Sequence, residues 1–373
     1  MVSRAESLSP DPVARLDASN LRAVADGCSV LGAGGGGDPQ LGLVMALGAV
    51  QDHGPVTVVT VKELAPEALI MPCGLIGSPT VASERIWSGD EGRILREAVE
   101  VLRGERVAAL MAYEIAGANG MLPVTWAARL SLPLVDADGR GRAFSELQQQ
   151  SMHLAGIPAS PVVVTDGRGN TLVVHAADDA WAERLARRAA ASLGGVCAAA
   201  LCCMTAREAR GAVIEGSLSL ARALGGAVEG LPARQRVAAT RDALGAVVLI
   251  DGKVLEIERG TDGGFVHGSA TVQGVGRDGA RQVRLELQNE FLLALEDGAV
   301  RAAVPDVITV LASDTGEPMA TDRLRFGERV IVLASLAPAV WLSDPGLAVV
   351  GPRAFGYDVD HVPIAAAPLD ARP

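Results

Sequence analysis

The chain has 373 residues, a formal net charge of −11 and a 49% hydrophobic content that is mostly Ala, Val and Leu. The length favours two domains, and the acidic balance argues against a nucleic-acid partner, because phosphate binding needs concentrated Lys and Arg. Five cysteines without a CxxC pair argue against a redox or structural zinc motif and favour a reducing compartment. Without a signal-peptide pattern or an apolar run near the ~20 residues that span a bilayer, we expect a cytoplasmic protein with no membrane partner.

Four segments are expected along the chain. Residues 1–14 are rich in Ser, Pro and charge, which is typical of a flexible leader. We expect an α/β N-terminal domain over 15–240, a β-rich C-terminal domain over 241–365 and a short tail over 366–373.

The first domain alternates helical stretches with continuous apolar runs. A helix is predicted from Asp17 to Gly27, and a second helix from residue 40 to residue 50 after a glycine-rich loop. Further helices are predicted at 92–103, 121–130, 179–193 and 217–224, the last ended by Gly225-Gly226. Strands are predicted at 56–61, 68–72, 107–112 and 133–136, and a hairpin at 162–175. Continuous apolar strands between helices indicate a mostly parallel sheet flanked by helices, so the predicted fold class is α/β.

Beyond about residue 240 the spacing of the apolar residues changes. Strict alternation at 268–273 and 283–288 is typical of half-buried strands, and the runs at 307–311 and 329–334 continue it. The stretch 246–258 predicts a hairpin that turns at Asp251-Gly252. This part is therefore expected to be a mostly antiparallel sandwich or open barrel.

A run of four glycines, Gly34 to Gly37, precedes Asp38-Pro39 and a predicted helix. Ordering such a run costs chain entropy, so it favours a close backbone approach or positive φ. Successive amides at a helix N-terminus bind anions, and a substrate carboxylate or a developing anion fits there. No Gly-Lys-Ser/Thr follows, so this is not a nucleotide phosphate loop. The alternatives are a plain flexible turn and, for Asp38, helix capping, a substrate hydrogen bond or a metal ligand.

Polar side chains follow three of the apolar runs. The carboxyl ends of parallel strands are where ligands bind, so these side chains are expected to converge on one site. They are Ser78, Thr80 and Glu84 after the run at 69–76, Glu114 and Asn119 after the run at 107–113, and Asp136, Asp138, Arg142 and Glu146 after the run at 132–135.

Close carboxylates split their pKa values, so one can act as a base while another stays protonated. Asp136 and Asp138 would point the same way on an extended chain and could share a metal ion or a water molecule. Arg142 offers a planar fork for a carboxylate or a ring imide anion. The alternative is a buried salt-bridge and turn network. The five histidines show no ligand spacing, and a nucleophilic Cys28 or Cys73 has no base beside it in the sequence.

Taken together, the motifs resemble the S-methyl thiohydantoin desulfurase-like family, often described as hydantoinase- or oxoprolinase-associated. They are the loop 31–39, the stretch 77–81 with Glu84, the stretch 114–119, the stretch 133–146, and the late motifs 304–306 and 351–358. The resemblance covers about residues 18–363. It implies an N-terminal α/β domain, a β-rich C-terminal domain, and hydrolysis of S-methyl thiohydantoins to hydantoins with release of methanethiol. Ser145, Ala116 and Arg85 depart from the proline, glycine and lysine expected there, which bears on the substrate more than on the fold.

We therefore expect a hydrolase that acts on a small S-methyl thiohydantoin or related hydantoin ring. Asp136 or Asp138 is the expected base or metal ligand, supported by Glu114. The expected substrate-binding residues are Gly34, Gly35, Gly36, Gly37, Asp38, Ser78, Thr80, Glu84, Asn119, Arg142 and Glu146. Two alternatives remain: a subunit or partner of an ATP-dependent hydantoinase or oxoprolinase, and a non-catalytic small-ligand-binding protein. A divalent metal ion and a homo-oligomer are left open.

Overall fold

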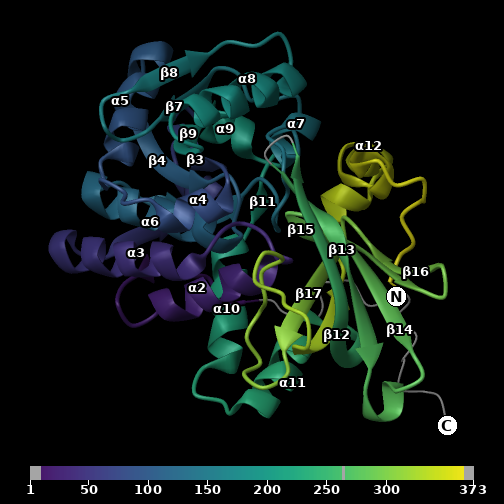
Figure 1. Cartoon of the computed structure of the whole chain (residues 1–373). Helices are drawn as coiled ribbons and strands as arrows, with labels where there is room; N and C mark the ends of the chain where they lie inside the picture. Colours follow the sequence, from purple (N-terminus) through teal and green to yellow (C-terminus); the bar gives the residue numbers. More distant parts are fainter. Residues whose placement is uncertain (1–9, 263–264, 365–373) are drawn as a thin grey trace.

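The computed structural model describes residues 10–262 and 265–364 (Figure 1). Most of the predicted leader, residues 1–9, and the predicted tail lie outside the described residues. The described residues form two large sheets and one two-stranded pair, and helices enclose the first large sheet while the second lies beside it. Among the described helices, none combines the length and apolarity needed to cross a bilayer.

The first sheet has nine strands in the described residues, in the order β1-β2-β5-β4-β3-β9-β7-β8, with β10 also paired to β3. The pairs β2–β5, β5–β4 and β4–β3 are parallel, and the other pairs are antiparallel. The predicted α/β class is confirmed, with a parallel centre extended by antiparallel strands. The strands are β1 (Arg15–Leu16), β2 (Val56–Val59), β3 (Leu69–Gly77), β4 (Val107–Ala112), β5 (Leu134–Val135), β7 (Val162–Thr165), β8 (Thr171–Val174), β9 (Val196–Ala200) and β10 (Met204–Thr205).

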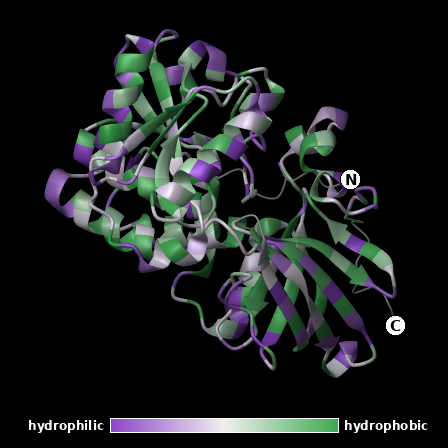
Figure 2. Cartoon of the chain, turned by 45° about the horizontal axis from the view of Figure 1, so that its top comes forward, coloured by the Kyte–Doolittle hydropathy of each residue, from purple (hydrophilic) through white to green (hydrophobic). Residues whose placement is uncertain are grey.

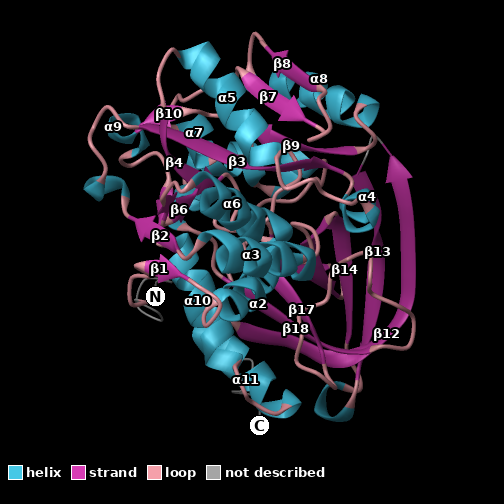
Figure 3. Cartoon of the chain, turned by 90° about the vertical axis from the view of Figure 1, so that its left-hand side faces the viewer, coloured by secondary structure: helices cyan, strands magenta, loops and turns pink. Residues whose placement is uncertain are grey.

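Helices cover both faces of this sheet. Alternate residues of a strand point to opposite faces, and the buried strands carry apolar side chains on both. Met71 and Cys73 of β3 belong to one buried cluster, and Ile70 and Ile76 belong to the other. Figure 3 shows α2, α3 and α6 layered over one face. That face is covered by α2 (Leu21–Leu31), α3 (Pro39–His53), α5 (Glu91–Arg103), α6 (Gly117–Leu130) and α10 (Ser217–Val228). The other face is covered by α8 (Asp179–Ser192), with the short α7 (Ser151–Leu154) and α9 (Ala206–Ala209) nearby.

Glycines set the close approach of α2 and α10, where the sequence predicted helix ends. A Cβ on Gly27 would lie 1.8 Å from the Ala221 carbonyl oxygen, and a Cβ on Gly225 would lie 1.8 Å from the Ala23 oxygen. Gly27 lies inside α2, and α10 continues past Gly225-Gly226 to Val228. The predicted stops at these glycines are therefore wrong, because the residues serve helix packing.

The second sheet is antiparallel, with the order β16-β15-β14-β13-β12-β18-β17 in the described residues. Strand β17 also contacts β15 and β16, so the sheet curls into a half-barrel around its own buried cluster, as expected of an open barrel. Figure 2 shows apolar and polar residues alternating along these strands. They are β12 (Val247–Asp262), β13 (Phe265–Gly274), β14 (Gln282–Gln288), β15 (Glu290–Glu296), β16 (Ala299–Ala303), β17 (Val307–Ala312) and β18 (Arg329–Ser335).

The predicted hairpin at Asp251-Gly252 is wrong. Both residues lie inside β12, which pairs with β18 over its first part and with β13 from Gly252 onwards. Gly252 faces Gly274, and a Cβ on Gly252 would lie 2.4 Å from the Gln273 carbonyl oxygen. The glycine thus allows close strand pairing, and two register shifts bend the strand without reversing it.

Short elements complete the chain. The strands β6 (Ala137–Asp138) and β11 (Ile214–Glu215) form a small separate pair. Helix α11 (Ala233–Leu244) links the two sheets, and the 3-10 turn η3 (Ala339–Leu342) and helix α12 (Asp344–Val350) pack against the second sheet's far end. The remaining elements are the helix α4 (Pro79–Glu84) and the 3-10 turns η1 (Val61–Glu63), η2 (Gly276–Asp278) and η4 (Pro352–Phe355).

Candidate functional site

A cavity lies where the carboxyl end of β3, the N-terminus of α6 and the β14–β15 turn meet. Its volume is about 70 Å³, enough for roughly five water molecules. Two parts of the chain contribute: the first half, which holds the first sheet, and the second half, which holds the second sheet. Glu290 begins β15 of the second sheet, and Asn289 lies in the β14–β15 turn. The lining residues are Gly36, Gly37, Leu75, Ile76, Gly77, Ser78, Pro79, Ala82, Tyr113, Glu114, Ala118, Asn119, Arg140, Phe144, Ser145, Leu147, Arg187, Val196, Asn289 and Glu290.

The glycine loop is held from both sides. The Ala33 carbonyl accepts a 2.8 Å hydrogen bond from Phe291 N, and the Gly34 carbonyl accepts one from Thr321 N at 3.0 Å. A Cβ on Gly35 would lie 2.3 Å from Glu290 Oε1, so a side chain there would displace the Glu290 carboxyl group. Gly36 and Gly37 have positive φ and reach the cavity, while Gly34 and Gly35 face the second sheet.

This loop also packs on the start of α6. Gly36 O accepts a 2.9 Å hydrogen bond from Ala118 N, so the loop's carbonyl satisfies one free amide of the helix. Among the described residues, the amides of Gly36 and Gly37 form no backbone hydrogen bond. Both glycines line the cavity, so they are the part of the predicted nest that adjoins it.

Glu114, Arg140 and Asn119 form a buried polar group on the cavity wall. The Glu114 carboxylate forms an ion pair with Arg140, accepts from Asn119 Nδ2 at 2.9 Å and accepts from Phe144 N at 3.1 Å. Asn119 Oδ1 accepts from Leu75 N at 2.7 Å. Glu114 and Arg140 are 2% and 3% exposed, so the pair is fully desolvated and geometrically fixed.

Glu290 is one of the cavity residues that the sequence did not reveal, and Arg140 and Arg187 are two others. Glu290 begins β15, is 3% exposed, and accepts a 2.8 Å hydrogen bond from Ser145 Oγ. Burial, reinforced by the nearby Glu114 carboxylate, raises the pKa of Glu290 from 4.5 to about 7. A carboxyl group with this pKa exchanges protons readily at neutral pH.

Asp136 and Asp138 do not line the cavity, contrary to the expected convergence. Asp136 Oδ1 accepts from Leu218 N at 2.9 Å and from Ser219 N at 3.1 Å, so its carboxylate satisfies amides at the start of α10. Its Oδ2 accepts from Ser219 Oγ at 2.5 Å. The sequence alone does not show that the chain folds back so that Leu218 and Ser219 reach Asp136.

Asp138 organises the backbone behind the cavity. Its Oδ2 accepts from three amides: Ile115 N at 2.9 Å, Arg140 N at 3.1 Å and Gly141 N at 2.8 Å. Burial raises the pKa of Asp138 to about 6 despite these hydrogen bonds. Because Ile115 follows Glu114, this carboxylate fixes both partners of the Glu114–Arg140 ion pair.

The other predicted site residues divide between the cavity and its surroundings. Ser78 lines the cavity and caps α4. Arg142 does not line it, because its buried guanidinium donates to the carbonyls of Pro305 at 2.8 Å and Asp306 at 2.6 Å. Three more lie outside the lining: Thr80 and Glu84 are exposed on α4, and Glu146 accepts a hydrogen bond from Gln148 at 2.6 Å.

Asp38 caps α3 by accepting from Gln40 N at 2.9 Å, and it forms a 2.5 Å ion pair with Arg323 of the second half. These are structural contacts of the kind expected of a helix cap. They also join the glycine loop to the second half of the chain.

No three His, Cys, Asp or Glu side chains among the described residues form a group that could hold a metal ion. The proposed shared metal of Asp136 and Asp138 does not fit, since both carboxylates accept hydrogen bonds from different backbone segments. Cys28 and Cys73 are buried in apolar surroundings, and burial raises the pKa of both thiols far above the ordinary range. Neither cysteine lines the cavity.

Comparison with known proteins divides the chain at a different point from the border between the two sheets. A family model described as "S-Me-THD-like, N-terminal domain" matches residues 19–176, and "S-Me-THD-like, C-terminal domain" matches residues 177–364. The border between the two models falls within the first sheet, because β9 and β10 come after it.

A crystal structure of a protein from Chromobacterium violaceum superposes with a TM-score of 0.77 at 22% identity, over 94% of this chain and 99% of that chain. At that identity the likeness concerns the fold. Among curated proteins no match is found. The two family models together span nearly all the described residues, so the chain belongs to the S-Me-THD-like family.

Proposed function

We propose that the protein hydrolyses the carbon–sulfur bond of a small S-methyl thiohydantoin or related ring in the cavity between its two sheets. Membership of the S-Me-THD-like family supports the ring chemistry. The observation that carries the proposal is Glu290, a buried carboxyl group with a pKa of about 7 beside a small cavity and a glycine loop.

The reacting carbon of such a ring lies between two nitrogens and carries the sulfur. In the proposed reaction the Glu290 carboxylate takes a proton from water as the water oxygen bonds to this carbon. Negative charge then develops on the ring, where the amides of Gly36 and Gly37 stabilise it. The carbon–sulfur bond breaks, and the departing methanethiolate takes the proton from Glu290, leaving a hydantoin and methanethiol.

The Glu114–Arg140–Asn119 group positions the wall against which the ring lies. All three side chains are bonded to one another or to backbone, so they present a fixed polar surface. In this proposal Glu114 remains in the site in a positioning role, and Glu290 replaces Asp136 and Asp138 as the base.

The test is to incubate the purified chain with S-methyl thiohydantoins and measure released methanethiol and the hydantoin product. Glu290→Gln is expected to lower kcat by about 10² or more, because the amide cannot accept the proton. Glu256→Gln changes an exposed carboxyl group of β12 in the same way and is expected to leave turnover unchanged.

In the wild-type chain kcat/KM is expected to rise with pH through an apparent pKa of about 7, as Glu290 ionises. Absence of thiol release from every S-methyl thiohydantoin offered would refute the proposed reaction. Unchanged turnover in Glu290→Gln would remove Glu290 from it.

A further inference from the structure

A second and larger cavity lies between α11 and the second sheet. Its volume is about 390 Å³, within the ~300–1,000 Å³ typical of small-molecule pockets. We call it the α11 pocket. Its lining residues are Arg234, Val237, Ala238, Arg241, Val248, Asp251, Ser313, Asp314, Arg329 and Ile331, and it shares none of them with the first cavity.

The pocket exists because α11 spans the sheet without packing closely on it. Four lining residues of α11 follow the spacing i, i+3, i+4 and i+7, so one face of the helix turns toward the sheet. Within α11 only Thr240 and Leu244 are buried. On β18, Val330 and Val332 face the half-barrel core, which leaves Arg329 and Ile331 on the face toward α11.

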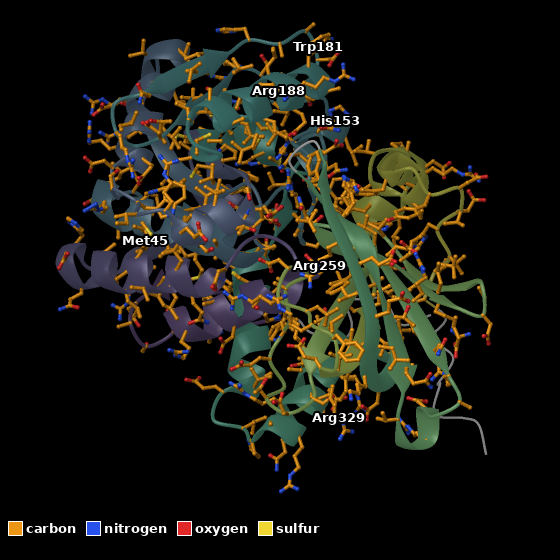
Figure 4. The ribbon with its side chains drawn as sticks, in the orientation of Figure 1. Met45, His153, Trp181, Arg188, Arg259 and Arg329 are labelled. Carbon is orange, nitrogen blue, oxygen red and sulfur yellow. The ribbon has the colours of Figure 1, made fainter. Side chains whose placement is uncertain are left out.

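The charges of the α11 pocket are of both signs and are not matched to each other. Arg234 and Arg329 form no ion pair with any described residue, and neither does the exposed Asp314. By contrast, Arg241 is bound to Asp242 at 2.7 Å. Figure 4 labels Arg329 at the end of the second sheet where α11 lies in Figure 1.

The apolar part of the lining includes Val237, Val248 and Ile331. The wall also contains two buried oxygens, Asp251 Oδ1 and Ser313 Oγ, that have no hydrogen-bond partner in the described structure. Buried polar atoms without a partner are rare because each costs about 1–3 kcal/mol. The pocket therefore offers cationic groups, an anionic group and apolar side chains. A ligand that fits it has a carboxylate, an ammonium group and an apolar part.

We propose that the α11 pocket binds a free α-amino acid with an apolar side chain. Arg234 and Arg329 hold the carboxylate, because guanidinium groups bind carboxylates in a planar fork. Asp314 receives the ammonium group, and the side chain lies on Val237, Val248 and Ile331. The site does not depend on the proposed hydrolysis, since the two cavities have no residue in common.

Isothermal titration calorimetry on the full-length chain tests this with three probes of one carbon skeleton. L-leucine carries both charges, 4-methylpentanoate lacks the ammonium group, and isoamylamine lacks the carboxylate. L-leucine is expected to bind at least about tenfold more tightly than either of the others, because each loses one charge-assisted contact.

Variants of exposed residues locate the site. Arg329→Gln and Asp314→Asn are each expected to weaken L-leucine binding about tenfold or more, and both are exposed, so the fold is expected to persist in far-UV circular dichroism. Arg168→Gln removes an exposed charge from the β7–β8 turn and serves as the matched control.

Three results would overturn the proposal. One is the absence of binding heat with both L-leucine and L-phenylalanine. Another is binding of 4-methylpentanoate as tight as that of L-leucine, which would make the ligand a simple anion. The third is L-leucine affinity that stays unchanged in both Arg329→Gln and Asp314→Asn, which would place the amino acid elsewhere.

Discussion

Substitution of Glu290 by glutamine tests whether this buried carboxyl group has the near-neutral pKa on which the proposed reaction depends. Its pKa rises from 4.5 to about 7 in the folded chain, chiefly by burial. At 1.36 kcal/mol per pKa unit, the shift corresponds to about 3 kcal/mol of folding free energy.

The raised pKa of Glu290 decides how its contribution to stability changes with pH. The folded protein holds this proton more tightly than the unfolded chain, so the stability it contributes is complete below pH 4.5. That stability is lost as the pH rises through 7, because the buried carboxyl group must then ionise. Glutamine keeps the shape and never ionises. The stability of Glu290→Gln relative to the wild type is therefore expected to increase by about 3 kcal/mol between pH 4.5 and pH 8.

Urea unfolding followed by far-UV circular dichroism at pH 4.5, 6 and 8 measures this difference, with Glu256→Gln as the exposed control. The comparison between variants cancels the titration of all other groups. A Glu290→Gln difference that stays constant from pH 4.5 to pH 8 would refute the reasoning, because it would mean that Glu290 titrates as an ordinary exposed carboxyl group.

Three further outcomes are expected. Gly225→Ala should destabilise the chain by about 1–3 kcal/mol in urea unfolding, because the new Cβ would overlap the Ala23 carbonyl. Gly226→Ala has open space around its Cβ and should stabilise the chain by about 0.5–1 kcal/mol. Equal effects of the two substitutions would contradict the close packing of α2 on α10. Asp138→Ala should cost about 3 kcal/mol or more in the same assay, because three backbone amides lose their acceptor, and Asp138→Asn should cost less because it keeps an oxygen there. The five thiols should react with a disulfide reagent at pH 8 only after unfolding, because four are buried and burial raises the pKa of the fifth, Cys203, to about 12; rapid reaction of the folded chain would contradict this.

Local patterns in the sequence predicted most of the elements because their signals are local. The hairpin of β7 and β8 forms as predicted. Glycines were the exception. Gly27, Gly225 and Gly252 were interpreted as ends or turns, yet each marks a close contact with a backbone far away in the sequence. A single sequence shows that a glycine is present but not which neighbour requires it.

The candidate site also depends on contacts between residues that are far apart in the sequence. Glu114, Asn119 and the glycine loop could be predicted because each stands at the end of an element with its own motif. Glu290 follows an alternating strand in a region where charged residues are common, and its contacts lie at Gly35 and Ser145. Nothing next to Glu290 in the sequence distinguishes it from a solvated carboxylate.

The arrangement implies that docking of the two halves raises the pKa of Glu290 and orders the glycine loop. The second half supplies Glu290, and the first half supplies the atoms that bury it: the Gly35 backbone, Ser145 and the nearby Glu114. The glycine loop is in turn fixed by hydrogen bonds from Phe291 and Thr321. Each half therefore lacks what the other provides. Because desolvation is the main cause of the raised pKa, separating the halves would return Glu290 to the range of an exposed carboxyl group and would release the loop at the same time.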